Sequence, residues 1–150
     1  MLCVHTPEIT LKSLMTFRTY SELIKLHSFE ERYSYLKLRG TVGLETFGHD
    51  RYMNQRFYTS KQWRDIRDHV IARDEGMDLA LKGHEIYDKI VIHHMNPMTV
   101  EELESGSGDV LDPEFLITTT HRTHNAIHYG DERHLPKPFV ERAAGDTKLW

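Results

Sequence analysis

Two groups of histidines have the residue type and the spacing to bind a metal ion. His93 and His94 are adjacent and end the apolar run IVIHH. His124 and His128 follow later in the chain and are four residues apart. On a helix this spacing places both imidazoles on one face, where they can reach the same ion. His121 belongs to the same stripe, and spacing alone does not choose between His121 and His128.

The sequence predicts that a strand positions the adjacent histidines and that a helix positions the two histidines four residues apart. The β-branched run at residues 90–94 predicts a strand, and LITTT at residues 116–120 predicts a second one. HRTHNAIH then predicts a helix that stops at Gly130. Neighbouring side chains of a strand point to opposite faces. One histidine of the adjacent pair can therefore face the helix and bind metal, while the other stays free to act as a base.

This division of roles suits hydrolysis of a phosphodiester bond. A metal ion stabilises charge on the scissile phosphate and on the leaving oxygen. A neutral imidazole, with a pKa near about 6.5, can take a proton from the attacking water. Two plainer interpretations also fit the pattern. Paired histidines at a strand end are often packing or surface residues, and four histidines can form a closed structural zinc site.

Composition limits the number of domains, the kind of metal site and the class of binding partner. A chain of 150 residues suits one domain, and the single cysteine, Cys3, excludes an intramolecular disulfide and a cysteine-based zinc site. No apolar run could span a bilayer and the N-terminus has no signal-peptide pattern, so we expect a cytoplasmic protein without a membrane partner. Residues 1–73 hold 12 Lys/Arg and 8 Asp/Glu, whereas residues 74–150 hold 7 and 15. The basic half could supply a phosphate-binding face.

Helix-start signals dominate the first part of the chain. Thr19 with Glu22, and Ser28 with Glu31, both fit the capping-box pattern S/T-x-x-E. We expect the second of these helices to stop at Gly40.

A longer amphipathic helix is predicted from SKQWRDIRDHVIARD, with Ser60 as its N-cap. Trp63, Ile66 and Val70 form an apolar stripe at helical spacing. The helix also carries cations on its other faces, for which a solvated surface is the plainer interpretation: Lys61, Arg64, Arg67 and Arg73.

Three stretches show no regular period. We expect residues 41–58 to be irregular, residues 77–88 to be a loop or a short extended piece, and residues 95–115 to be a long acidic connection.

Taken together, these motifs resemble the HNH endonucleases, whose catalytic core is a ββα-metal motif, and most closely the branch found in bacteriophage genomes. The resemblance runs from about Thr19 to the end of the chain. IHHMNP combined with LITTTHRTHNAIHYGD is its most specific part, and SKQWRDIRDHVIARD supports it.

The resemblance implies a role for individual residues. His94 would be the general base and His93 a metal ligand, with His124 and His128 as further ligands. The helix that carries these last two would lie against the minor groove and the phosphates at the cut site. The implied ion is a divalent metal such as magnesium, manganese, nickel or zinc. The residues implied to contact DNA are Lys61, Arg64, Arg67 and Asn125.

Two features depart from the family pattern. Many relatives hold a structural zinc through two CxxC pairs, but here the later pair aligns with Thr120 and Thr123, and DEGMDLALKG has no cysteine. We expect packing of the N-terminal helices and the tail to replace that zinc. The family's middle asparagine, which braces the loop, aligns with Phe115. Either Asn96 or another loop group takes its role, or the alignment is shifted, or activity is weakened.

The sequence therefore predicts an α+β fold: a helical region over residues 15–59, a ββα-metal (HNH) core over 60–135, and a tail over 136–150 that packs on the domain. Residues 1–14 would either precede a start site at Met15 or be disordered.

The predicted function is metal-dependent cleavage of DNA in phage genome packaging, with phage terminase as a possible partner. The alternatives are a homing-type nuclease and a non-catalytic, metal-stabilised DNA-binding or interaction protein.

Overall fold

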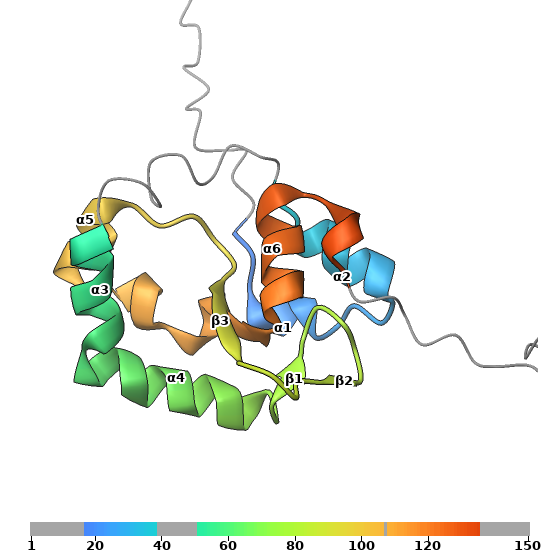
Figure 1. Cartoon of the computed structure of the whole chain (residues 1–150), viewed down its shortest axis with the longest axis horizontal. Helices are drawn as coiled ribbons and strands as arrows, with labels where there is room; N and C mark the ends of the chain where they lie inside the picture. The colour runs from blue at the N-terminus through green and yellow to red at the C-terminus, as the bar shows by residue number, and fades with distance from the viewer. Residues whose placement is uncertain (1–16, 39–50, 107, 136–150) are drawn as a thin grey trace, which may run out of the picture.

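The computed structural model describes residues 17–38, 51–106 and 108–135, which form an α+β fold (Figure 1). The α+β prediction is thus confirmed. The helices are α1 (Tyr20–Leu23), α2 (Phe29–Leu36), α3 (Arg51–Thr59), α4 (Lys61–Arg73), α5 (Val100–Ser105) and α6 (His121–Tyr129), with 3-10 turns at Gly108–Leu111, Pro113–Phe115 and Glu132–His134. The strands are β1 (Met77–Asp78), β2 (His84–Glu85), β3 (Val91–His94) and β4 (Leu116–Thr119).

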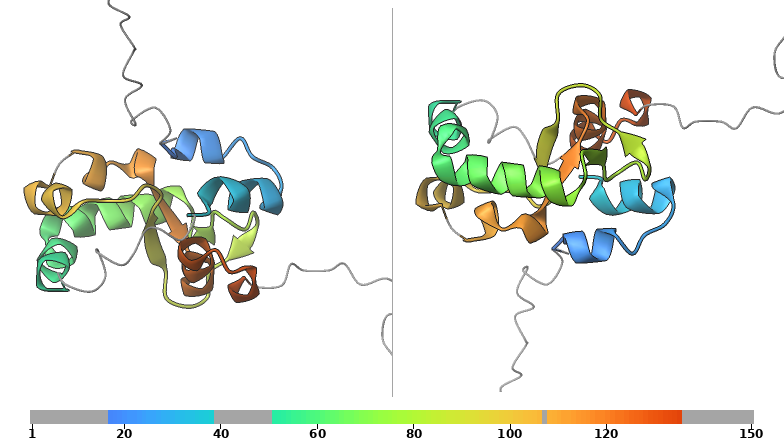
Figure 2. Two further views of the ribbon diagram at one scale, coloured as in Figure 1. Left: turned by 90° about the horizontal axis from the view of Figure 1, so that it is seen from above. Right: turned by 90° about the horizontal axis from the view of Figure 1, so that it is seen from below.

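The strands form two small antiparallel sheets, β1 with β2 and β3 with β4. In the second sheet His93 pairs with Ile117 and His94 pairs with Leu116. The two strands predicted around this pairing are confirmed. Figures 1 and 2 show α4 running along one side of the molecule, with α3 and α5 near its first residues. The β1–β2 hairpin lies near the last residues of α4 (Figure 1).

The first helices begin at capping residues, as predicted. Ser28 and Glu31 form a complete capping box at the start of α2. Thr19 forms only half of one, because the carboxylate of Glu22 accepts a hydrogen bond from the Tyr35 hydroxyl instead, at 2.6 Å.

The predicted stop of the second helix at Gly40 is wrong, because α2 ends at Leu36. The chain leaves the helix at Lys37, and the N–H of Leu38 donates to the Ile127 carbonyl of α6 at 3.2 Å instead of continuing α2.

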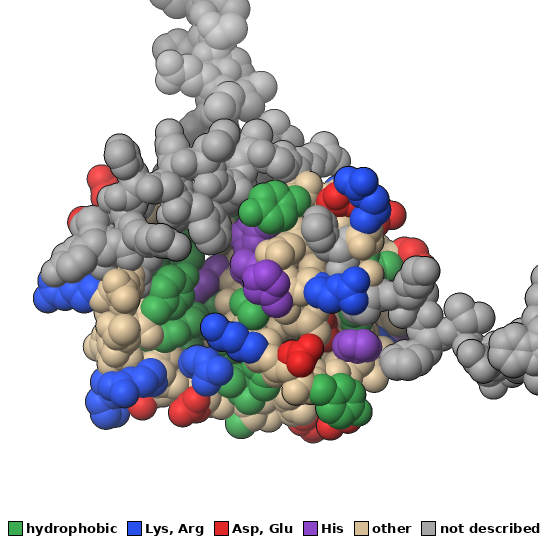
Figure 3. Space-filling model, viewed as in Figure 1, with side chains coloured by type: hydrophobic (Ala, Val, Ile, Leu, Met, Phe, Trp, Pro, Cys, Tyr) green, Lys and Arg blue, Asp and Glu red, His purple; other side chains and the backbone are tan. Residues whose placement is uncertain are grey.

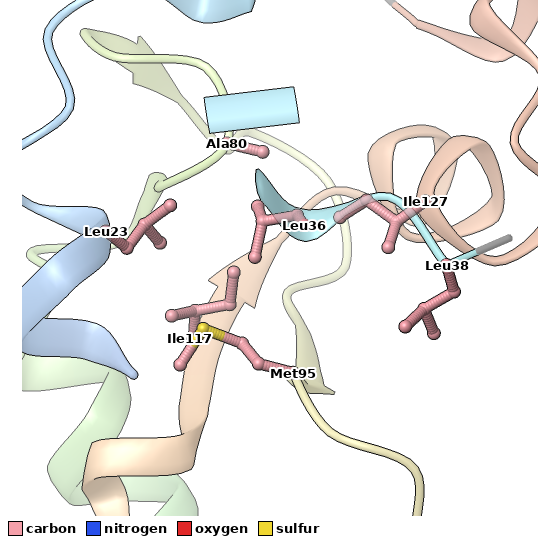
Figure 4. Close-up of a cluster of buried hydrophobic side chains, with 7 residues drawn as sticks. All are labelled: Leu23, Leu36, Leu38, Ala80, Met95, Ile117 and Ile127. Carbon is pink, nitrogen blue, oxygen red and sulfur yellow. The ribbon is translucent and has the colours of Figure 1, made fainter. Parts of the chain in front are cut away.

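One hydrophobic cluster fixes α6 against the β3–β4 sheet (Figure 4). It gathers side chains from α1, α2 and the segment after it, the turn after β1, the residue after β3, β4 and α6: Leu23, Leu36, Leu38, Ala80, Met95, Ile117 and Ile127. Burying a leucine, isoleucine or methionine side chain contributes roughly 1.5–3 kcal/mol, so the cluster holds α6 firmly in place.

A second cluster packs α3, α4 and α5 together and against β4. Its buried members are Phe57, Trp63, Val70, Leu103, Val110 and Leu116. The stripe predicted on α4 is confirmed, since Trp63 and Val70 are buried and Ile66 packs against the same cluster.

Two stretches are more regular than predicted. Residues 51–59 form α3, although we predicted an irregular chain up to residue 58. The ring centre of Phe57 lies 5.3 Å from that of Trp63 on α4. Because α3 is held by this tertiary contact, the hydrophobic periodicity of its own sequence does not indicate a helix. Helix α5 interrupts the predicted connection, and it begins with a complete capping box of Thr99 and Glu102. The T-x-x-E pattern of this box is present in the sequence and indicates the start of a helix.

Some predictions lie outside the described residues. These are the extension over residues 1–14 and the packing of the tail, residues 136–150. The boundaries of the core, 60–135, stay a prediction. None of the helices in the described part of the chain has both the length and the apolar character that crossing a membrane requires.

We predicted that Arg73 lies on a solvated face of its helix, but its side chain points inward. Its guanidinium donates to the Asp74 carboxylate at 2.7 and 3.1 Å, to the Pro113 carbonyl at 2.6 Å and to the Leu116 carbonyl at 2.7 Å. It also stacks 3.7 Å from the centre of the Tyr20 ring. Arg73 thereby ties the end of α4 to α1 and to the start of β4.

We expect Arg73→Met to lower the free energy of unfolding by roughly 3 kcal/mol, because it leaves the buried Asp74 carboxylate without its cation. Urea denaturation measures the change. The control is Arg64→Met on the exposed side of the same helix, which should shift stability by less than roughly 0.5 kcal/mol. Equal effects of the two substitutions would contradict the inward role of Arg73.

Candidate metal centre

The two adjacent histidines point to opposite sides of the β3–β4 sheet. His93 is fully buried and faces α6, with its ring centre 5.3 Å from that of His124 and 5.0 Å from that of His128. His94 packs on the other side, where its ring stacks on Trp63 at 5.3 Å. The alternation of a strand thus places the two imidazoles in separate environments.

His93, His124 and His128 form a cluster of three possible metal ligands. One ring nitrogen from each residue lies within 4.8 Å of the other two. The Nε2 atoms of His124 and His128 are 3.1 Å apart, as the one-turn spacing on α6 allows. His121 is exposed and its Nδ1 lies 3.4 Å from the Asn125 amide nitrogen. The structure therefore groups His128, rather than His121, with the other two.

The ring of His93 is the most unusual polar group of the cluster. Among the residues that the structure describes, neither its Nδ1 nor its Nε2 has a hydrogen-bond partner, although the side chain is 0 % exposed. Leaving a buried polar atom without a partner costs roughly 1–3 kcal/mol. A ligand that bonds to a ring nitrogen would remove this cost for one of the two nitrogens, and a metal ion is such a ligand.

The electrostatics of the cluster favour neutral rings. Burial, and then the neighbouring His124 and His128, hold the pKa of His93 well below its usual range. Burial followed by His128 lowers the pKa of His124 to about 4, and burial lowers that of His128. Neutral imidazoles keep the lone pairs that metal coordination requires.

The donor set fits a divalent transition metal. Three imidazoles suit zinc, nickel, cobalt or manganese better than calcium, and magnesium would need water to complete its shell. Three protein ligands also leave a coordination position for water or substrate, which distinguishes catalytic sites from closed structural sites. The cluster therefore fits the divalent ion that the sequence predicted.

His94 is held by groups from outside its own strand. Its Nε2 lies 3.2 Å from the carbonyl oxygen of Val110, which can only accept, so Nε2 carries the proton and Nδ1 keeps a lone pair. Burial lowers its pKa to about 4. His94 also borders a cavity of about 40 Å³, together with Asn96, Glu102 and Asp109. That volume is enough for a water molecule.

The chain after His94 is braced by Asn96. Its side-chain oxygen accepts from the backbone N–H of Arg18 at 2.7 Å, and its amide donates to the Arg18 carbonyl at 2.9 Å. Phe115 contributes through its backbone, because its carbonyl accepts from the N–H of Met95 at 3.0 Å. Its ring lies 6.5 Å from that of Phe17.

The residues predicted to contact DNA lie at the surface of α4 and α6. Lys61 and Arg64 are exposed, and Arg67 and Asn125 are partly exposed. Lys61 pairs with Asp65 at 2.6 Å, one turn along the helix. Figure 3 shows histidine side chains near the centre of one face, with Lys and Arg side chains over the region of α4 on the same face.

Sequence reasoning missed two groups that hold His94. Trp63 was assigned to the core only, yet its ring also stacks on the imidazole. The Val110 carbonyl is a backbone group, and every residue has one, so no sequence signal could have identified it.

Comparisons with protein-family models, with curated proteins and with solved structures find no match to this chain. The resemblance to the HNH endonucleases therefore stays a prediction from sequence motifs.

We expect zinc, nickel or cobalt ions to raise the thermal stability of the wild-type protein. An ion at 100 times its Kd adds about 2.7 kcal/mol to the free energy of unfolding. His128→Ala should lose most of this gain, whereas His121→Ala should keep it, because His121 lies outside the cluster. Differential scanning calorimetry with and without metal measures the gain. The same gain in both variants would contradict the assignment of His128.

Acid should destabilise the metal-free protein. The pKa values of His94 and His124 are about 4 in the folded chain, against about 6.5 when unfolded. Between these two pKa values the unfolded chain binds more protons than the folded chain. The contribution of these groups to the free energy of unfolding is therefore fully present above about pH 6.5 and falls as the pH drops towards 4. The expected loss from pH 7 to pH 5 is roughly 1–2 kcal/mol for each group.

Urea denaturation in EDTA at several pH values would measure this loss. His124→Ala should flatten the pH dependence, because the unfolded chain then has one fewer proton to gain. A wild-type stability that is constant between pH 7 and pH 5 would contradict the assigned burial of these imidazoles.

Proposed function

We propose that the protein is a metal-dependent endonuclease of the HNH type, which hydrolyses phosphodiester bonds of DNA. The observation that carries the proposal is the buried ring of His93, which has no hydrogen-bond partner among the described residues and faces His124 and His128. The order of strand, strand and histidine helix in β3, β4 and α6 agrees with the order that the HNH resemblance predicts, and this supports the proposal.

His93, His124 and His128 would hold the divalent ion. When bound, the ion would stabilise negative charge on the scissile phosphate and on the leaving oxygen. The three side chains come from two elements that the hydrophobic cluster around Ile117 and Ile127 holds together. Little rearrangement is therefore needed to receive the ion.

His94 would act as the general base. The Val110 carbonyl fixes the proton on Nε2, which leaves Nδ1 to take a proton from the attacking water. The lowered pKa, which results from burial, keeps the ring neutral at pH 7. Stacking on Trp63 restricts the rotation of the ring and keeps Nδ1 in one orientation.

Binding to DNA would be directed mainly to the backbone. The candidate contacts are three cations on α4 and Asn125 on α6, and Lys and Arg reach phosphates without reading the sequence. The phage resemblance makes genome packaging beside a terminase the proposed setting.

A nicking assay on supercoiled plasmid tests the activity. Wild type should nick DNA with manganese, nickel, zinc or magnesium and not in EDTA. His94→Ala should lower the rate by roughly 10²–10⁴-fold while it still binds metal, because it removes the base and no ligand. His121→Ala is the matched control and should keep activity. Nicking that persists in EDTA, or that His94→Ala does not slow, would refute the mechanism.

A second candidate is a non-catalytic protein that uses the metal ion for stability. Phe115 favours it, since the family's asparagine is expected at this position. Metal-induced stabilisation of the wild type without nicking under any of these ions, together with binding to DNA, would select this candidate.

A further inference from the structure

A buried carboxylate lies at the start of α6, outside the histidine cluster. Asp78 is 0 % exposed, and one of its oxygens accepts from the backbone N–H of Thr120 at 3.0 Å while the other accepts from that of Ala80 at 3.1 Å. The hydroxyl of Thr120 in turn donates to the hydroxyl of Thr123 at 2.9 Å, which links the residue that Asp78 holds to the first turn of α6. Asp78 therefore bonds to both sides of a junction, the turn after β1 and the beginning of α6.

The two threonines are the residues that begin α6. Thr120 is the N-cap, and its hydroxyl oxygen accepts from the backbone N–H of Thr123 at 3.1 Å. The first amides of a helix have no partner inside the helix and carry its partial positive charge. A buried carboxylate at this end is therefore both a hydrogen-bond acceptor and a favourable charge.

Asp78 is itself held on a fixed support. The N–H of the next residue, Leu79, donates to the Thr118 carbonyl of β4 at 3.1 Å. The carbonyl of Leu79 accepts from the buried guanidinium of Arg32 at 2.7 Å. The segment around Asp78 is thus bound to β4 on one side and to α2 on the other, so it can fix the position of whatever it holds.

The position of α6 decides whether three ligand nitrogens meet. His124 follows Thr123 directly and His128 lies one turn further, whereas His93 lies on β3 and reaches α6 only across the β3–β4 sheet. A small tilt of α6 would separate these nitrogens, which lie within 4.8 Å of one another.

We propose that Asp78 is a positioning residue of the metal centre, which sets α6 against the β3–β4 sheet so that His124 and His128 meet His93. This inference rests on the proposed metal-binding function. The hydrogen bonds of Asp78 go to Ala80 and Thr120 rather than to the histidines, so its effect on the ligands passes through Thr120 and Thr123.

The test compares Asp78→Asn with Thr118→Val. The first removes the negative charge and replaces one acceptor oxygen with a donor. The second removes a buried hydroxyl of β4 whose hydrogen-bond partners are Asp74 and the Met77 carbonyl rather than the first residues of α6. Both should lose stability. Only a positioning residue should change the metal site in protein that is still folded.

The measurement is titration with Co²⁺ at low temperature, where circular dichroism shows each variant to be folded. Asp78→Asn should raise the Kd for Co²⁺ by about tenfold or more and alter its visible spectrum, as loss of outer-shell support does elsewhere. Thr118→Val should leave both unchanged. If Asp78→Asn does not fold, Thr123→Val replaces it, since it removes one hydroxyl from the same network. An unchanged Kd in the Asp78-network variant would overturn the inference.

Amide hydrogen exchange of the metal-free protein separates the two proposals. Asp78→Asn should speed exchange of the first amides of α6 and leave those of α4 unchanged. If wild type binds no Co²⁺, the proposed function fails, and the exchange result decides the role of Asp78 alone. Unchanged exchange in α6 would overturn it.

Discussion

The buried imidazole of His93 is the constraint that shapes the rest of the structure. Its two nitrogens lie in the interior without a hydrogen-bond partner among the described residues, and two further imidazoles crowd around it. Such a group is costly unless something binds to it. His93 is the one fully buried residue of β3, where Ile92 packs against the second hydrophobic cluster. Stability elsewhere in the molecule must offset the cost of this buried ring, and the two hydrophobic clusters provide that stability.

The β3–β4 sheet separates these clusters and gives each histidine its own surroundings. Ile117 pairs with His93 and belongs to the cluster on the α6 side, whereas Leu116 pairs with His94 and belongs to the cluster around α4. The two-residue period of the strand therefore explains both sites at once. A shift of one residue in this register would exchange the two histidines and bury the wrong ring against α6.

Local patterns in the sequence were enough to predict the elements that carry the histidines. The β-branched runs, the caps and the one-turn spacing of His124 and His128 each act within a few residues, so β3, β4, α4 and α6 could be identified. The choice of His128 over His121 could not, because it depends on how α6 is rotated against β3. Contacts such as Arg73 with Leu116 and Asp78 with Thr120 join residues that are far apart in the chain. A sequence without its fold gives no sign of them.

The loop near His94 is held by several hydrogen bonds, so the presence of Phe115 does not by itself leave the loop without support. The resemblance to the HNH endonucleases predicts an asparagine at position 115 that braces the loop through its side chain, which phenylalanine cannot do. In this chain the hydrogen bonds come from elsewhere: Asn96 bonds twice to the backbone of Arg18, and Phe115 itself accepts from Met95 through its carbonyl. A backbone carbonyl does not depend on the side chain of its residue. The aromatic ring is then free to pack near Phe17, beside the cavity that His94 borders. The bracing is thus divided among several groups, and Phe115 removes only one way of achieving it.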